Sequence, residues 1–313
     1  MTEKYQALNT SIAAGLNYIL SRQAEEGAWT EWTLPPGSSS TWTTAYVGYM
    51  LRNLPLKPAA IAARRIEKAV HWLTGHALPD CAWGYNEWVG SDADSTAYAI
   101  LFLTSVDQSV PDTAYAALAD WQCADGGMTT YLPMGEPHAW NISHPDVTPI
   151  VLQAMLTHST PDQAVLQRGI EFVLGQRSLG GLWNSFWWDS CLYATAANLS
   201  LMQTMGFKMT SCIALTQIKP ANAFESALLI SSLLSVQCDD FPVLINDLVD
   251  QLIKQQQPDG SWNTAPILRI TRRDCYAPWI ATDAGPLYAE THRLFTTATV
   301  LHALSQVHNA FRI

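Results

Sequence analysis

Apolar residues recur three and four positions apart along most of the chain, and strictly alternating stretches are scarce. This period places apolar side chains on one face of a helix, so the pattern predicts an all-α protein. The segments between the apolar stretches are mostly short. We expect helices over 11–23, 43–53, 58–74, 95–104, 112–122, 146–157, 161–176, 192–205, 221–236, 243–256 and 291–308.

A short marker returns between these helices. It consists of a glutamine late in one helix, a small polar turn with glycine, and then an aromatic residue. Glycine supplies the positive φ that ends a helix, and the aromatic residue can pack back over the last turn. Four copies span 23–29, 122–128, 176–183 and 256–262, of which the second ends on methionine, and a fifth at 81–85 keeps the glycine and the aromatic residue without the glutamine.

The spacing of the markers predicts a repeat architecture. Most lie about 45–55 residues apart, and one longer gap before Trp262 leaves room for an unmarked turn around 206–220. The result is six helical hairpins, each of which buries its apolar face only against its neighbours. Such hairpins can stack in a line or close into an α/α barrel, and periodicity alone does not choose. No linker rich in Pro, Gly or Ser divides the chain, so we expect one domain over 1–313.

Composition and charge remove several classes of function. Of 313 residues, 48% are hydrophobic, 14% are charged and 13 are Trp, with a net charge of −10. An acidic chain without a basic stripe is unsuited to nucleic acid. No apolar run approaches the roughly 20 residues that a membrane-spanning helix needs. The N-terminus carries no signal-peptide pattern, and the six Cys form no CxxC pair, so we expect a cytoplasmic protein with reduced thiols.

Two acids, Asp92 and Asp94, precede the helix expected at 95–104. Acids at such a position are ordinary helix caps, because they bind free amides and favour the positive end of the helix dipole. Here, however, Trp83, Tyr85 and Trp88 precede them and an apolar helix follows, which predicts an aromatic wall beside the acids. Burial penalises the anion, so an acid in such surroundings keeps its proton and can deliver it.

The segment 92–97, Asp-Ala-Asp-Ser-Thr-Ala, resembles the Asp-x-Asp-Asp-Thr-Ala motif of class II terpene cyclases, above all squalene–hopene cyclases. The similarity spans roughly 80–310. Because the chain has room for one helical domain, it resembles the single-domain meroterpenoid cyclases, whose fold is an α/α barrel. The further segments that match in order are 122–128, 145–148, 181–183 with Trp187, and 192–196.

The resemblance implies a role for each matching residue. Asp94 is the proton donor to a terminal alkene or epoxide, and Asp92 is the flanking carboxylate that orients it. Asp146 lines the same pocket, and Trp187 faces the growing cation. Tyr193 is linked through water to the acid, as a route for its reprotonation.

Two positions depart from the family pattern. Ser95 occupies the place of the last Asp of the motif, so one hydrogen-bonding carboxylate is missing. Ile150 stands where squalene–hopene cyclases carry a His that hydrogen-bonds the acid. His144, upstream of Ile150, is either a substitute for that residue or a cap or surface histidine.

Other residues are weaker candidates for the substrate pocket. They are aromatic, and each can equally belong to the core: Trp140, Trp188, Trp279, Tyr288 and Phe295. Arginine forks suit a carboxylate or phenolate. Arg269, Arg272 and Arg273 are therefore candidates for binding a head group, and the alternative is a solvated loop.

The implied enzyme is an isomerase that protonates a prenylated substrate and guides cationic polycyclisation. Its pocket must exclude water, stabilise carbocations on aromatic faces, and hold the prenyl chain prefolded. We expect no cofactor and no metal. The expected partner is a small polyprenyl or prenylated aromatic molecule, collected through peripheral contact with a membrane, and nucleic acid is not a partner.

Two other classes of protein remain as alternatives. A zinc-dependent protein prenyltransferase β-like subunit shares the barrel, and Asp189 and Cys191 have its ligand spacing, but Thr296 stands where its His belongs. A non-catalytic α/α toroid similar to the thioester domains of complement-like proteins is the second, although the chain has no Gly-Cys-Gly-Glu-Gln segment. Asp239 and Asp240 lack the third acid of a magnesium-binding motif, so we interpret them as helix caps.

Overall fold

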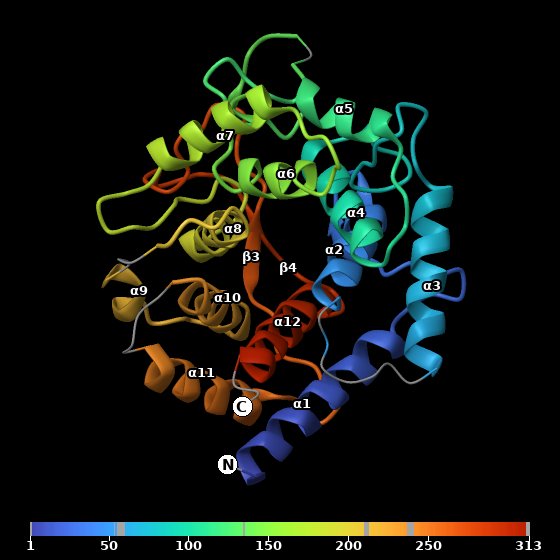
Figure 1. Ribbon diagram of the computed structural model, residues 1–313, viewed down its shortest axis with the longest axis vertical. Coiled ribbons are helices and arrows are strands. Elements are labelled where there is room, and N and C mark those ends of the chain that lie inside the picture. Colours follow the sequence, from blue (N-terminus) through green and yellow to red (C-terminus); the bar gives the residue numbers. More distant parts are fainter. Residues whose placement is uncertain are drawn as a thin grey trace.

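The computed structural model describes residues 2–52, 54, 60–133, 135–209, 213–236 and 241–310. Within these residues, six helices form an inner ring around one axis (Figure 1). Each packs against the next in chain order, and the last packs against the first, so the ring is closed. The inner helices are α2 (Thr41–Met50), α4 (Ala93–Ser105), α6 (Thr148–Met155), α8 (Cys191–Thr204), α10 (Ala223–Leu234) and α12 (Leu294–Ala310).

A second set of helices surrounds this ring, and each packs against an inner neighbour. The outer helices are α1 (Thr2–Ser21), α3 (Ala60–Gly75), α5 (Asp112–Asp120), α7 (Gln163–Gly175), α9 (Ile213–Gln217) and α11 (Phe241–Gln255). The closure that periodicity left open is therefore settled in favour of the α/α barrel. The short helix α9 occupies the gap in which we expected an unmarked turn, so the six-hairpin prediction is confirmed for the described residues.

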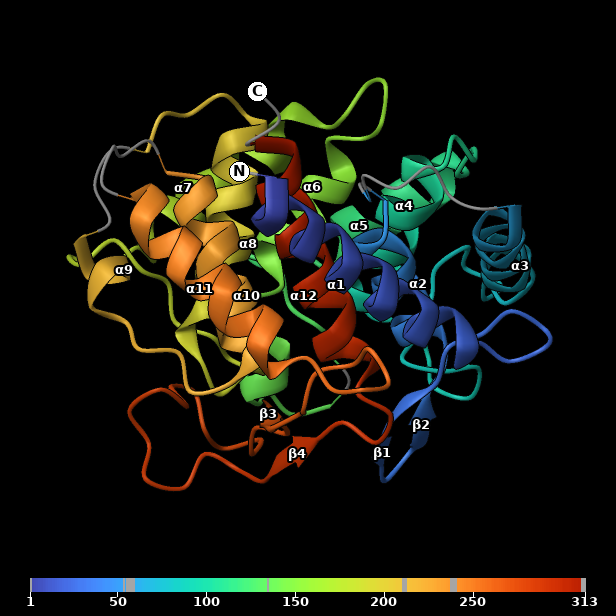
Figure 2. The same cartoon turned by 90° about the horizontal axis from the view of Figure 1, so that it is seen from below.

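Two small antiparallel hairpins lie at one end of the barrel (Figure 2). They pair β1 (Glu31–Leu34) with β2 (Gly37–Ser39), and β3 (Pro266–Arg269) with β4 (Leu287–Ala289). The inner helices α2 and α12 begin directly after them, so this is the amino-terminal end of the inner ring. The sequence pattern did not predict these strands, because each is only three or four residues long. A 3₁₀ turn, Ala139–Asn141, also lies in a long loop.

The repeated marker holds successive hairpins together. In four turns the indole N–H of tryptophan donates to the carbonyl ten residues earlier, at 2.7–2.9 Å, as Trp29 does to Ile19 and Trp183 does to Val173. The glutamine amide crosses to the next outer helix, as Gln122 does to the Val165 carbonyl. Close packing of backbone explains the glycine, because a Cβ at Gly126 would lie 2.4 Å from the Arg168 carbonyl oxygen.

A threonine on each inner helix except α10 completes the marker. The backbone N–H at the aromatic position donates to its hydroxyl, as in the pairs Trp29–Thr44 and Trp83–Thr96. The same contact occurs at Trp183, Trp262 and Met128. Met128 therefore takes the structural place of tryptophan in the third turn, although its side chain has no N–H to donate.

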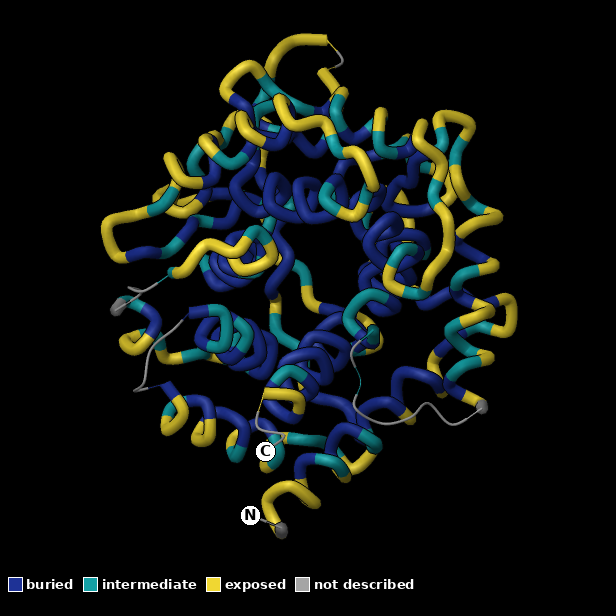
Figure 3. Tube along the Cα trace, viewed as in Figure 1, coloured by how far each residue is buried: buried dark blue, intermediate teal, exposed yellow. Residues whose placement is uncertain are grey.

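The expected helices match the observed ones to within a few residues at most ends. The first is an exception, because it begins at Thr2 instead of at residue 11. The expected start of the third, at residue 58, lies outside the described residues. The inner helices are buried on nearly all sides, whereas the outer helices expose one face (Figure 3). Because the inner helices are buried on nearly all sides, sequences such as Ala97–Leu103 are apolar or small throughout and have no polar face.

Candidate active site

The amino terminus of α4 carries the first acid. Asp92 is the N-cap, and its carboxylate accepts hydrogen bonds from the backbone N–H of Ser95 at 2.7 Å and from the Ser95 hydroxyl at 2.8 Å. The loop before it is tied to its surroundings, because the Asp92 N–H donates to the Trp83 carbonyl and the Ala93 N–H to the Thr130 carbonyl. Both the backbone and the side chain of Ser95 thus donate hydrogen bonds to the Asp92 carboxylate. In this conformation Asp92 is a helix cap, and the backbone of Asp94 is among the groups that hydrogen-bond its carboxylate.

Asp94 lies in the first turn of α4 and faces a cavity at the hairpin end of the barrel. Its Oδ1 atom is buried and has no hydrogen-bond partner among the described residues. The cavity encloses about 480 Å³, part of it open to solvent. Its lining consists of the acids, hydroxyl-bearing residues, aromatic rings and aliphatic side chains: Asp92, Asp94, Ser95, Thr130, Tyr85, Tyr131, Trp42, Trp187, Trp188, Leu34, Leu268 and Ile270.

Three carboxyl groups influence one another at this end of the barrel. Burial raises the pKa of Asp94 well above its ordinary value, and the charges of Asp92 and Asp146 raise it further. Only the Trp42 indole acts in the opposite direction. Burial also raises the pKa of Asp92 to about 7 and that of Asp146 to about 6, but hydrogen-bond donors oppose the shift in both.

The hydrogen bonds decide which of the three acids keeps its proton. The Asp146 Oδ2 atom accepts the backbone N–H groups of Phe186 and Trp187, both at 2.8 Å. Such donors stabilise a carboxylate anion, and Asp92 has them too. Asp94 lacks comparable donors and carries the strongest repulsion. These contacts favour the protonated form at Asp94 over that at Asp92 and Asp146, which their hydrogen-bond donors help to ionise.

Asp146 and its neighbours also hold the aromatic wall in place. The Trp187 indole N–H donates to the Thr130 hydroxyl at 2.7 Å, and that hydroxyl also pairs with His144 Nδ1 at 2.8 Å. His144 is fully buried and stacks on Phe186 with ring centroids 4.0 Å apart. Burial lowers its pKa to about 4, so the ring is neutral at pH 7. The surface alternative for His144 is wrong, and its hydrogen-bond partners are Thr130 and the Ala139 carbonyl instead of the acid.

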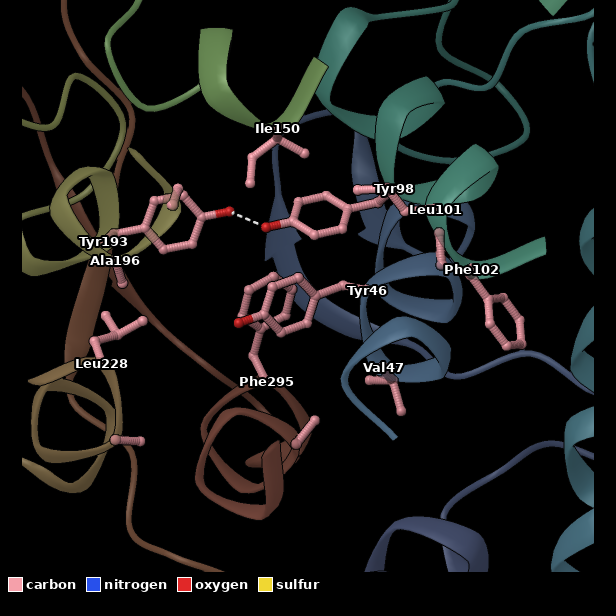
Figure 4. Packing of buried hydrophobic residues seen from close by; sticks show 14 of the residues in the cluster. Tyr46, Val47, Tyr98, Leu101, Phe102, Ile150, Tyr193, Ala196, Leu228 and Phe295 are labelled. Carbon is pink, nitrogen blue, oxygen red and sulfur yellow. Dashed lines mark hydrogen bonds between the residues drawn. The ribbon is translucent and has the colours of Figure 1, made fainter. Parts of the chain in front are cut away.

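An aromatic layer crosses the barrel beneath the cavity (Figure 4). Phe295 stacks on Tyr46 with ring centroids 3.5 Å apart, and Trp188 stacks on Tyr193 at 4.1 Å. The hydroxyls of Tyr193 and Tyr98 are 2.6 Å apart. Tyr98 lies one helical turn after Asp94, and burial raises the pKa values of both tyrosines well above their ordinary value.

The strand β3 covers the cavity from outside. Its backbone pairs with the segment 187–189: the Asp189 N–H donates to the Ile267 carbonyl, and the Arg269 N–H donates to the Trp187 carbonyl at 2.6 Å. Arg269 is 7% exposed, and its guanidinium pairs with Asp189 at 2.6 Å. The solvated-loop alternative is therefore wrong for Arg269, whereas Arg272 is half exposed and pairs with Asp274 and Asp283. Neither arginine lines the cavity.

The predicted aromatic residues separate into three groups. Trp187 and Trp188 line the cavity, and Phe295 packs beneath it. Trp140 packs against Trp187 with centroids 5.4 Å apart but does not line the cavity itself. The rest lie elsewhere: Tyr288 is on β4, outside the lining, and Trp279 and Trp88 are 40% and 85% exposed. The expectation that Trp88 contributes to the aromatic wall is wrong.

Several residues of the site were missed from the sequence. Tyr98 could have been found from helical spacing, because a residue four positions after Asp94 shares its face. Trp42, Thr130 and Tyr131 carry no local signal, because turns and helices far apart in the chain bring them to the cavity.

The metal-ligand alternative has no donor set in the described part of the chain. No group of three or more His, Cys, Asp or Glu side chains there could hold a metal ion. Asp189 is engaged with Arg269, and Thr296 donates to Glu290. Asp239 and Asp240 lie outside the described residues. A search of the described helices finds none that is long and apolar enough to cross a membrane.

Comparisons with known proteins found one sequence-family match and several solved structures with a similar fold. The sequence family described as the A-macroglobulin TED domain matches residues 1–119. No curated protein sequence matches the chain. Among solved structures, a variant of the type II terpene cyclase MstE from Scytonema, in complex with its substrate geranylgeranyl dihydroxybenzoate, is 23% identical, with 99% of each chain covered and a TM-score of 0.85.

Two further solved structures support the same fold. MstE from Scytonema in complex with its product, merosterolic acid A, is 23% identical, with 99% of each chain covered and a TM-score of 0.86. The ent-copalyl diphosphate synthase from Streptomyces platensis is 16% identical, with 85% of this chain and 50% of that chain covered and a TM-score of 0.59. The chain has the α/α-barrel fold of the type II terpene cyclases.

Proposed function

We propose that this protein is a class II terpene cyclase of the meroterpenoid type, in which Asp94 starts the reaction by protonating an alkene or epoxide. One observation carries the proposal. Asp94 presents a buried carboxyl group, without a hydrogen-bond partner at Oδ1, to a cavity whose other walls are mainly aromatic and aliphatic. A carboxylic acid in such surroundings stays protonated and therefore has a proton to deliver, whereas one that is solvated or accepts several hydrogen bonds is ionised.

The surrounding residues suit the consequences of that proton transfer. Addition of the proton to a C=C bond leaves a tertiary carbocation, which water would capture at once, so the reaction needs a dry cavity. Trp42, Trp187, Trp188 and Tyr131 surround the acid with ring faces and edges. A ring face stabilises a cation by about 0.5–2 kcal/mol without acting as a nucleophile.

The charges of the cavity favour an uncharged group beside the acid. No Lys, Arg or His lines it among the described residues. A diphosphate would find no cation there, whereas the end of a prenyl chain needs none. MstE, which has this fold, takes geranylgeranyl dihydroxybenzoate as its substrate, and this supports a prenylated aromatic acid as the substrate class.

The proposed reaction conserves every atom of the substrate. The Asp94 proton adds to the CH carbon of the terminal alkene and leaves a tertiary cation at its neighbour. The π electrons of successive alkenes then close the rings, and loss of a proton or capture by a substrate oxygen ends the sequence. In the first case one proton enters and one leaves, so the product is an isomer of the substrate. The Asp94 carboxylate must then be reprotonated, and the Tyr98–Tyr193 hydroxyl pair lies beneath it.

The experiment is incubation of the purified protein with geranylgeranyl dihydroxybenzoate, with products separated by chromatography and identified by mass and NMR. The proposal expects products of unchanged mass with fewer alkene protons. Asp94→Asn should bind substrate but lose turnover by several orders of magnitude, because an amide cannot deliver the proton. Asp120→Asn is the matched control, since Asp120 is an exposed acid on α5. An active Asp94→Asn enzyme would show that another acid starts the reaction.

A non-catalytic toroid is the second candidate, because the TED-domain match over 1–119 favours it. That match covers turns and helices common to α/α barrels, and the chain has no Gly-Cys-Gly-Glu-Gln thioester segment. Failure of the wild-type protein to convert any prenylated substrate, epoxides included, would favour this candidate. Cytoplasmic location and collection of substrate from a membrane surface are further parts of our proposal, and cosedimentation with phospholipid vesicles tests the second.

A further inference from the structure

A second cavity opens at the opposite end of the barrel, at the carboxyl ends of the inner helices. It encloses about 590 Å³, part of it open to solvent, and all six inner helices contribute to its wall. Tyr46, Tyr98 and Tyr193 form part of its lining (Figure 4). None of its lining residues also lines the cavity of Asp94, so the aromatic layer separates two sites.

The second cavity differs from the first in its charge. Arg52, directly after α2, contributes the only permanent charge among the described lining residues, and none of them is acidic. His302 on α12 also lines the cavity, and burial together with the Arg52 charge lowers its pKa to about 3, so this ring is neutral. Its Nδ1 atom is buried without a hydrogen-bond partner among the described residues. Among the described residues of its lining, the cavity therefore carries one positive charge and no negative charge.

The Arg52 side chain is held in place and only partly satisfied. Its guanidinium lies 3.5 Å from the centroid of the Tyr49 ring, and its Nη1 donates to the Tyr49 carbonyl at 2.7 Å. None of the ion pairs among the described residues includes Arg52. Glu67 shares a neighbouring groove with Arg52 but makes no ion pair with it. A partly desolvated cation without a counter-ion is unfavourable unless an anion joins it.

The remaining wall combines apolar surface with donors. Ile150, Ala196 and Leu228 offer contact to a hydrocarbon or an aromatic body. The Gln306 Oε1 atom accepts from the Ser231 hydroxyl at 2.7 Å, which leaves the amide N–H groups of Gln306 available to a ligand. A ligand that fits must therefore bring acceptors and a negative charge at one end and an apolar body at the other.

We propose that this cavity binds a small carboxylate with an aromatic or apolar body, whose carboxylate pairs with Arg52. A guanidinium presents two parallel N–H groups, which match the two oxygens of a carboxylate. A phosphate dianion would need further cations, and the described lining offers none. The proposal does not depend on the function of Asp94, because the two cavities share no residue.

Isothermal titration calorimetry with benzoate tests the proposal, with benzamide as the neutral analogue of the same shape and inorganic phosphate as the competing anion. Benzoate should bind and benzamide should bind at least tenfold more weakly, because benzamide cannot form the ion pair. Equal binding of the two, or tighter binding of phosphate, would overturn the assignment.

Variants locate the site within the second cavity. Arg52→Gln should weaken benzoate binding at least tenfold, whereas Arg64→Gln, at an exposed arginine on α3, should leave it unchanged. Ala196→Leu narrows the cavity without touching the charge and should also weaken binding. Thermal melting of each variant checks the fold, and Ala196→Leu decides the matter if Arg52→Gln fails to fold. Unchanged binding in the folded variants would refute the proposal.

Discussion

The protonated state of Asp94 has a direct effect on stability, which an Asp94→Asn variant exposes. An unfolded aspartate releases its proton near pH 4. In the folded protein burial and the charges of Asp92 and Asp146 raise the pKa of Asp94 well above that value. Between these two pKa values the folded state holds one more proton than the unfolded state. The free energy of unfolding therefore falls as the pH rises through this window.

The magnitude follows from linkage. One proton released on unfolding changes the free energy of unfolding by about 1.4 kcal/mol per pH unit. Asparagine has the same shape and does not titrate, so the variant lacks this loss. We expect the stability of Asp94→Asn relative to wild type to rise with pH above about 4, at up to about 1.4 kcal/mol per pH unit, until the pH reaches the raised pKa of Asp94. The variant that loses activity should thus gain stability relative to the wild type as the pH rises toward neutral.

Urea unfolding followed by far-UV circular dichroism, at several pH values, measures the difference. Asp92, Asp146 and Glu290 titrate in both the wild type and Asp94→Asn, so their contributions cancel to first order in the difference between the two proteins. Their coupling to Asp94 modifies the slope of this difference against pH. Asp120→Asn provides the baseline, because its carboxyl group is exposed. A stability difference that stays constant from pH 5 to pH 7 would mean that Asp94 is ionised in the folded protein, and the reasoning about the acid would then be refuted.

Three further predictions concern the surroundings of the acid and the repeat. Trp187→Ala should give truncated or prematurely quenched products, because a ring face beside the acid is lost; an unchanged product profile would remove Trp187 from the reaction. Thr130→Val should broaden the product mixture and lower the free energy of unfolding by about 1–3 kcal/mol, since the buried Trp187 N–H loses its acceptor. Chromatography and urea unfolding test both effects, and an unaltered variant would contradict them. Trp183→Phe should cost about 1–3 kcal/mol of stability, because the Val173 carbonyl loses its buried donor, and a cost no larger than that of an exposed substitution would contradict the role assigned to the marker.

The fold could be predicted largely from local sequence, because its determinants repeat. The glutamine, glycine and tryptophan of each marker make the same contacts in successive hairpins, so one pattern identifies most turns. Closure of the ring could not be predicted from local sequence in this way. It depends on the packing of α12 against α2, a contact between distant segments for which periodicity carries no signal, and it came from the resemblance alone.

The site could be predicted only where its residues lie in a motif. Asp94 follows from its neighbours in sequence, whereas Trp42 and Tyr131 reach the cavity from other hairpins. Buried acids with purely structural partners were also missed. Glu31 accepts backbone N–H groups of His292 and Leu294 at the start of α12, across most of the chain, and nothing near Glu31 in sequence indicates this contact.

The central claim is that a buried acid adds its proton to a hydrocarbon. Incubation of the protein with geranylgeranyl dihydroxybenzoate in D₂O, followed by mass spectrometry and NMR of the product, tests it most directly. The account predicts one deuterium per product molecule, located at the former CH carbon of the terminal alkene, which receives the proton, and no such product from Asp94→Asn. A cyclised product without deuterium at that carbon would contradict the account.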